Sequence, residues 1–250
     1  MRKKTLTATM IVLLLSQALL SACKKAETTG EGLKVSPEAH QKEMVKKSFE
    51  ESKKAIAAKI NGESITMFSL LREMNTIAPQ YAAAGTQRTP ELDQKIRTDA
   101  LHTLIFQEMA VQEARKRGMK VDPEAIDREM ENIRATTGPG DAFREFLARN
   151  GLTEQELRKT IEQDALFEMI AAQEIDAKIT VTDAALRERY KKEKAGWKDP
   201  AHRKMTFEES KVVLERKVRA EAAEKRMREW EQELKKNARI EIIEQKQKQG

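Results

Sequence analysis

The stretch Ala57-Ala58-Lys59-Ile60-Asn61-Gly62-Glu63-Ser64-Ile65-Thr66 opens the folded part of this 250-residue chain. Asn61 and Gly62 tolerate the positive φ angles that the two central residues of a type I′ turn require, and such turns join the strands of tight hairpins. The ten residues therefore predict a β-hairpin that ends at Thr66. Thr66 in turn predicts a helix N-cap, because a threonine side chain accepts a hydrogen bond from the free amides of a first helical turn.

Most of the chain after the hairpin has the pattern of helices. Thr153-x-x-Glu156 and Thr206-x-x-Glu209 are capping boxes, and Pro90 and Pro123 stand where a helix accepts proline in its first turn. Near the end, residues 239–243 alternate partly like a strand. The sequence predicts a mainly α fold of several helices, with a small β-sheet formed by the N-terminal hairpin and the C-terminal strand.

Proline and glycine predict several boundaries. Pro79 and Gly85 are expected to end the first helix after the hairpin. The residues 195–200 are expected to form a loop ahead of the last long helix. The predicted domain covers residues 55–243, and its three parts are a helical lobe (66–194), a returning helix (206–237) and a terminal strand (239–243).

The N-terminus has the pattern of a secretory signal. Arg2, Lys3 and Lys4 precede an apolar run that ends in Leu20-Ser21-Ala22-Cys23. This ending resembles the lipobox of bacterial lipoproteins. The resemblance implies that residues 1–22 are removed and that Cys23 carries several acyl chains such as palmitate, since one chain holds only marginally. The alternative is an ordinary cleaved signal with an incidental cysteine.

The predicted lipoprotein would lie at the periplasmic face of a bacterial membrane. Lys24 stands where aspartate would retain a lipoprotein at the inner membrane, so the usual sorting pattern favours the outer membrane. The polar residues 23–54 are expected to form a flexible tether, and a weak helix starting near Pro37 is left open within it. Residues 244–250 are expected to be a disordered tail.

Composition excludes several classes of function. The formal charge of +6 falls to +3 without the three basic residues of the signal, and charged residues of both signs make up 35% of the chain. Such a mixed surface does not indicate a nucleic-acid partner. Cys23 is the single cysteine, so no disulfide framework is predicted. No phosphate-binding loop, nucleophile elbow or HExxH motif is present, so we predict no catalytic residue, metal site or cofactor.

The order of these segments resembles the SurA/PrsA-type periplasmic chaperones. The hairpin from Ala58 to Thr66 resembles the opening of that family, and residues 104–108 and 114–122 resemble its next helix and turn. Residues 179–183 followed by Tyr190 resemble the exit from the first lobe. Residues 206–242 resemble the returning helix and final strand. The resemblance implies a chaperone lobe that holds unfolded or exported polypeptides and aids their folding or outer-membrane assembly.

The chain departs from the catalytic members of that family at one point. Those members insert a parvulin prolyl-isomerase domain between the exit helix and the returning helix. Here only residues 191–205 fill this gap, and chains below roughly 40 residues rarely fold alone. We therefore expect a chaperone without isomerase catalysis.

A chaperone needs exposed apolar side chains, and methionine is common on surfaces that bind many partners. Our predicted client-binding residues are Met67, Phe68, Leu71, Met74 and Tyr81 on the first helix, with Phe143 and Phe146 on a short later helix. The opposing interpretation is that such residues only fill the core.

Two other functions stay open. The chain could be a lipoprotein adaptor or assembly subunit for one dedicated partner, or it could retain some prolyl-isomerase activity. Neither clients nor oligomeric state follow from the sequence, and a homodimer is left open.

Overall fold

A computed structural model describes residues 37–196 and 198–243. The predicted signal over residues 1–22, the acylated Cys23 and the disordered tail over residues 244–250 lie outside the described residues. So does the part of the predicted tether from residue 23 to residue 36.

The predicted hairpin is present. Strands β1 (Ile56–Ile60) and β2 (Glu63–Thr66) are joined by Asn61 and Gly62, whose φ angles are 53° and 96°. Both angles lie in the left-handed region that a type I′ turn demands. The local sequence is therefore sufficient to explain this turn.

The predicted C-terminal strand completes a three-stranded sheet. Strand β3 (Ile240–Ile242) lies beside β1, in the order β2-β1-β3. The Asn61 amide donates to the Arg239 carbonyl at 2.9 Å, and the Ile243 amide donates to the Ala57 carbonyl at 2.9 Å. Because residue numbers rise on one strand as they fall on the other, β1 and β3 are antiparallel.

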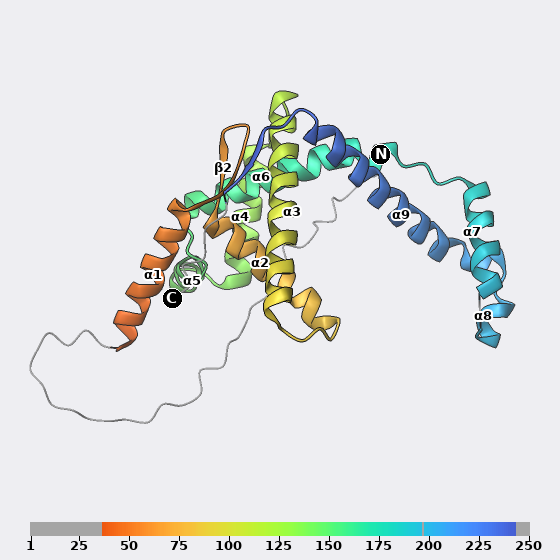
Figure 1. Cartoon of the computed structure of the whole chain (residues 1–250), viewed down its shortest axis with the longest axis horizontal. Helices are drawn as coiled ribbons and strands as arrows, with labels where there is room; N and C mark the ends of the chain where they lie inside the picture. The colour runs from red at the N-terminus through yellow and green to blue at the C-terminus, as the bar shows by residue number, and fades with distance from the viewer. Residues whose placement is uncertain (1–36, 197, 244–250) are drawn as a thin grey trace, which may run out of the picture. The chain divides into compact units, whose positions relative to one another are not determined.

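Helices account for most of the described chain, as the sequence predicts. They are α1 (Pro37–Lys54), α2 (Met67–Ala83), α3 (Pro90–Lys116), α4 (Pro123–Thr137), α5 (Asp141–Arg149), α6 (Glu154–Glu174), α7 (Asp183–Gly196), α8 (Pro200–Lys204) and α9 (Phe207–Lys235), with the 3₁₀ helix η1 (Asp176–Lys178) after α6 (Figure 1). Thr66 caps α2 as predicted, and both capping boxes are formed.

Three expectations need correction. Residues 37–54 form α1, the helix from Pro37 that the sequence left open, instead of a flexible tether, and Phe49 of this helix contacts the ring of Phe68 on α2. Pro79 does not end α2, which runs on to Ala83. This proline lies on an exposed face, where water can satisfy the carbonyl that it leaves without a donor. The loop expected over residues 195–200 is shorter than predicted, because α7 continues to Gly196 and α8 begins at Pro200.

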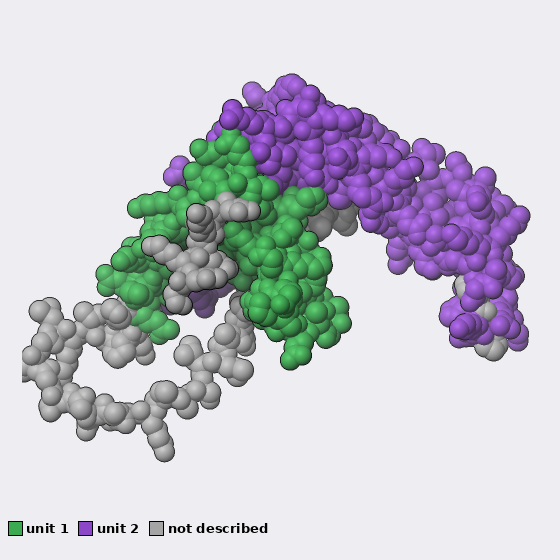
Figure 2. Space-filling view, viewed as in Figure 1, with its two compact units in different colours: residues 1–59, 63–104, 241–250 green, residues 60–62, 105–240 purple. Residues whose placement is uncertain are grey.

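The described chain falls into two compact units, which Figure 2 shows in two colours. Unit 1 comprises residues up to 59, residues 63–104 and residues from 241 onward, so it holds α1, β2, α2 and the first half of α3. Unit 2 comprises residues 60–62 and 105–240, and it holds the second half of α3 and helices α4 to α9. The domain predicted over residues 55–243 thus contains two units.

Aromatic side chains from distant segments meet in the core of unit 2. Phe106 on α3 makes edge-to-face contacts with Phe167 on α6, at 5.7 Å between ring centroids, and with Trp230 on α9, at 5.3 Å. Such pairs stabilise a core beyond the area that they bury. Phe106 therefore joins three helices. Elsewhere in this unit α9 packs along α7 (Figure 1).

Candidate functional site

The first two predicted client-binding residues lie in the core of unit 1. Phe68 is buried, with its ring edge-to-face with Phe49 of α1 at 5.7 Å. Lys53 and Arg72 place their charged groups over the same ring. Met67 is also buried, and the guanidinium of Arg97 donates to its sulfur. Helix α1 covers Phe68, and Met67 is buried as well, so neither residue offers open surface in this structure.

The other predicted residues of α2 are more accessible. The side chain of Leu71 is 45% exposed, whereas Met74 and Tyr81 are half-buried. The Tyr81 hydroxyl donates to Asp99 of α3, and Lys95 binds the same carboxylate at 2.8 Å. Hydrogen bonds from Lys95 and Tyr81 lower the pKa of Asp99 below its ordinary value. Tyr81 thus links α2 to α3 through its hydrogen bond. Of the predicted client-binding residues, Leu71 is the one whose apolar side chain is exposed.

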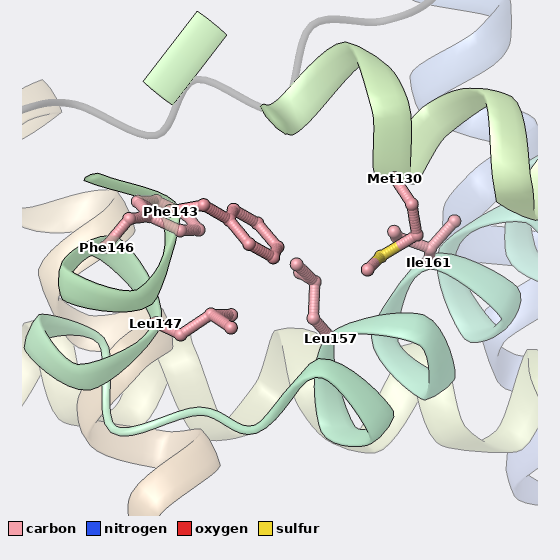
Figure 3. Close-up of a cluster of buried hydrophobic side chains, with 6 residues drawn as sticks. All are labelled: Met130, Phe143, Phe146, Leu147, Leu157 and Ile161. Carbon is pink, nitrogen blue, oxygen red and sulfur yellow. The ribbon is translucent and has the colours of Figure 1, made fainter. Parts of the chain in front are cut away.

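Phe143 and Phe146 lie in the core of unit 2. Figure 3 shows them on α5 with Leu147, facing Met130 of α4 and the residues of α6. All six residues of this cluster are buried: Met130, Phe143, Phe146, Leu147, Leu157 and Ile161. Helices α4, α5 and α6 share one small core here, in which the apolar face of α5 is buried. Phe143 and Phe146 are therefore buried in this structure and line no open groove, and their role in client binding stays a prediction.

Other apolar residues are exposed in their place, and the sequence analysis did not select them. On unit 1 these are Met44 and Val45 of α1, with Ile242 and Ile243 at the end of the sheet; on unit 2 they are Met169, Val212, Val213 and Met227. One signal could have found Val212 and Val213. These two valines directly precede the core residue Leu214, and three consecutive residues of a helix cannot all face the same side. If Leu214 faces the core, at least one of the valines is expected to face solvent.

A charge cluster holds the helices of unit 2 together. Glu174, whose side chain is 9% exposed at the end of α6, accepts from Arg117 in the turn directly after α3 at 2.7 Å and from Arg226 of α9 at 2.9 Å. Lys178 also contacts this carboxylate, and the Arg226 side chain donates to the backbone carbonyl of Glu174. Burial by itself raises the pKa of Glu174, but hydrogen bonds from Lys178, Arg117 and Arg226 outweigh it and lower the pKa to about 2. The arrangement is structural, because its acceptor groups are all engaged.

The polar pocket of unit 2 and the carboxylates of the described residues bear on catalysis and metal binding. Unit 2 has a pocket of about 420 Å³ beside the hairpin turn, lined in part by Asn61, Gln112, Trp230 and Glu233. Its lining contains no histidine, cysteine, serine or threonine, so it offers no hydroxyl or thiol nucleophile. Residues 37–196 and 198–243 contain no group of three or more His, Cys, Asp or Glu side chains placed to bind a metal ion. Within these residues, every helix is too short or too polar to span a bilayer.

The arrangement of hairpin, helices and returning strand agrees with a known family. Residues 41–171 match the family described as SurA-like N-terminal domain, and this range is more than half of the chain. The chain belongs to this family. The match begins inside α1, so the SurA-like domain includes a helix that the sequence analysis assigned to the tether.

Curated relatives of this SurA-like chain carry the same family name. The proteins named Chaperone SurA from Bordetella pertussis and Bordetella bronchiseptica are each 26% identical to it over 187 residues, which is 72% of this chain and 34% of the relative. Chaperone SurA from Methylobacillus flagellatus is 25% identical over 135 residues, covering 52% of this chain and 30% of the relative. The chain therefore spans about a third of the length of these relatives.

The SurA-like fold has no room for a parvulin domain between α7 and α9. Helix α7 ends at Gly196 and α9 begins at Phe207, with α8 between them. The Tyr190 hydroxyl of α7 donates to the Met205 carbonyl at 2.7 Å, and the Tyr190 ring meets Phe207 edge-to-face. These contacts close the two ends of the short connection onto each other.

Proposed function

We propose that this SurA-like chain is a membrane-anchored periplasmic chaperone of the holding type. It binds unfolded or exported polypeptides and aids their folding or their assembly into the outer membrane. The observation that carries the proposal is the family membership, together with relatives named as chaperones over 72% of the chain. Because the chain spans only about a third of those relatives, their activity is extended to it as a hypothesis.

The distribution of exposed apolar side chains supports holding of varied clients. Leu71 on α2 is 45% exposed and Val212 on α9 is 68% exposed, and further exposed residues lie on α1 and α6. Small apolar patches on several helices can each contact a different part of a non-native chain. Contacts of this kind are individually weak, so release needs no ATP. A surface built for one rigid ligand would instead gather its apolar residues in one deep pocket.

Membrane attachment through Cys23 is part of the proposal. The lipobox-like sequence before it, and the thirteen residues from Lys24 to Ser36 between it and α1, would place the chaperone near the bilayer. Lys24 favours the outer membrane. We expect the expressed chain to incorporate labelled palmitate. The Cys23→Ser variant should lose this label. Equal labelling of both chains would exclude acylation at this residue.

The chaperone is proposed to act without isomerase catalysis, since residues 191–205 are too few for a parvulin domain. A prolyl-peptide assay should show only the uncatalysed relaxation of tens to hundreds of seconds. Clear acceleration would favour the alternative of a residual isomerase.

The decisive experiment is aggregation suppression by the chain from residue 26 onward. Several unrelated proteins are diluted from denaturant, and light scattering is followed with and without the chain. We expect suppression for most of them. Suppression should be weaker when both Met44 and Leu71 are changed to serine, because this removes two exposed apolar side chains of unit 1. The matched control is Asn75→Ser, an exposed polar position on α2.

The same experiment separates the proposal from an adaptor function. A chaperone suppresses aggregation of unrelated clients, whereas an adaptor leaves them all to aggregate and is recovered from cells with one partner. No suppression for any client would reject the holding function.

A further inference from the structure

The hydrogen bonds between β1 and β3 determine which backbone groups of β3 face outward. The carbonyl of Arg239 and the amide of Ile243 both bond to β1. In an antiparallel pair, the residues whose backbone groups face the partner strand alternate with residues whose groups face away from it. Ile240 and Ile242 therefore direct their amides and carbonyls to the outer side of β3.

The outer edge of β3 is open in the described part of the chain. Among residues 37–196 and 198–243, β1 is the one strand that pairs with β3, and Ile242 is 58% exposed. Proteins usually protect such an edge with proline, lysine or a covering element, because its unpaired groups accept another strand. Residues 240–242 contain neither proline nor lysine, and the side chain of Glu241, their one charged residue, lies on the opposite face of the strand from those of Ile240 and Ile242.

The opposite edge of the sheet is different. Helix α1 packs against β2, which forms that edge. The outward-facing Ser64 is polar, and Thr66 uses its side chain to cap α2. A second strand therefore finds less apolar contact at β2 than at β3.

The side chains on one face of the sheet also make β3 the more favourable edge for an added strand. Ile242 lies opposite Ala58 in the register of β1 and β3, so the two side chains share one face of the sheet with Ile60. Ala58 and Ile60 are fully buried, whereas Ile242 is largely exposed. Ile242 is thus the accessible margin of an apolar sheet face, next to which an added strand would place its own apolar side chains.

We propose that the outer edge of β3 binds an extended segment of a non-native client polypeptide by β-strand addition. This inference rests on the proposed chaperone function and specifies the chemistry of its client. The segment would have apolar residues at alternate positions, because alternate side chains of a strand share a face. Ile240 and Ile242 each offer one donor and one acceptor, so the contact is short and readily reversible.

The register supplies a selective variant. Ile242→Pro removes an amide that faces outward, and it leaves the Ile243 amide bonded to Ala57. Proline is compatible with edge strands when its missing donor faces solvent. Ile242→Ala keeps the outward amide and removes only side-chain contact. Ser64→Pro is the counterpart of Ile242→Pro on the other edge of the sheet, because it removes the backbone amide of Ser64 from β2.

The measurement is binding of a fluorescent extended peptide with alternating valines to the full chain in mild detergent, followed by anisotropy. We expect Ile242→Pro to weaken binding about fivefold to tenfold, the effect of losing one backbone hydrogen bond, and Ser64→Pro to leave binding unchanged. The same peptide with a central proline should bind poorly to the unaltered chain. Equal binding by the unaltered chain and Ile242→Pro would overturn the inference.

Hydrogen exchange on the unaltered chain keeps the test independent of how the variants fold. Bound peptide should slow exchange of the Ile240 and Ile242 amides, and absence of this protection while the peptide is bound would reject the edge as its site. Concentration-dependent dimers that Ile242→Pro abolishes would assign the edge to a second copy and also reject the inference. If aggregation is suppressed but these amides stay unprotected, the chaperone proposal stands and only the edge proposal fails.

Discussion

Replacing Glu174 by glutamine should destabilise unit 2 severely. The change removes the negative charge from a buried site and leaves Arg117, Arg226 and Lys178 facing one another around a neutral amide. The pKa of Glu174 is lowered from 4.5 to about 2 in the folded chain. Each pKa unit corresponds to about 1.4 kcal/mol, so the charged carboxylate contributes about 3 kcal/mol to the free energy of unfolding at neutral pH.

The pH dependence has a definite sign. Because the pKa of Glu174 is lower in the folded chain than in the unfolded chain, its contribution is complete above about pH 5 and falls as the pH drops towards 2. Glutamine does not titrate. The stability difference between the original chain and Glu174→Gln should therefore be largest at pH 7 and should shrink between pH 5 and pH 3.

Urea unfolding followed by tryptophan fluorescence measures this effect. A Trp197→Phe background leaves Trp230 as the single tryptophan, and Trp230 is buried against Phe106 within unit 2. The matched control is Glu224→Gln, which breaks an exposed i,i+4 pair with Arg228 and should change stability by less than about 0.5 kcal/mol. The reasoning is refuted if Glu174→Gln behaves like this control, or if its effect does not diminish in acid.

Further predictions concern packing, capping and the hairpin turn. Phe146→Ala in the core of α4, α5 and α6 should destabilise unit 2 by roughly 3–5 kcal/mol in urea unfolding, whereas the exposed Val212→Ala should change it by less than about 0.5 kcal/mol. Thr153→Ala removes a complete capping box and should lower the unfolding free energy by about 1 kcal/mol, with loss of helical signal in circular dichroism. Gly62→Ala has open space for its methyl group but keeps a φ of 96°, so a loss on the order of 1 kcal/mol is expected from backbone strain. An unchanged melting temperature for Gly62→Ala would contradict the assigned turn.

The local structure of this protein was largely readable from its sequence. Asn61 and Gly62 specify the hairpin turn, and the capping boxes at Thr153 and Thr206 specify the starts of α6 and α9. These features depend on residues within four positions of one another, so their energetics do not require knowledge of the rest of the fold. Pro79 shows the limit, because its effect on α2 depends on whether the face that it occupies is exposed.

Burial was decided by tertiary structure. Phe68 and Leu71 lie three residues apart on α2, yet α1 covers Phe68 and leaves Leu71 exposed. Phe143 and Phe146 looked equally suited to bind clients, but α4 and α6 enclose them in a core. A pattern of apolar residues identifies a helix face without identifying what packs on it, since that depends on segments distant in the chain.

The sequence alone determined the class of the chain: a mainly helical SurA-like domain with a hairpin at its start, a strand at its end and too few residues for a catalytic insert. Only the tertiary structure decided which apolar groups remain accessible. The sequence predicted that the C-terminal strand joins the hairpin, but only the folded structure gives the register, in which Ile243 pairs with Ala57 and the amides and carbonyls of Ile240 and Ile242 face away from β1. The register of such a long-range pairing depends on packing of the whole chain, which no local pattern encodes.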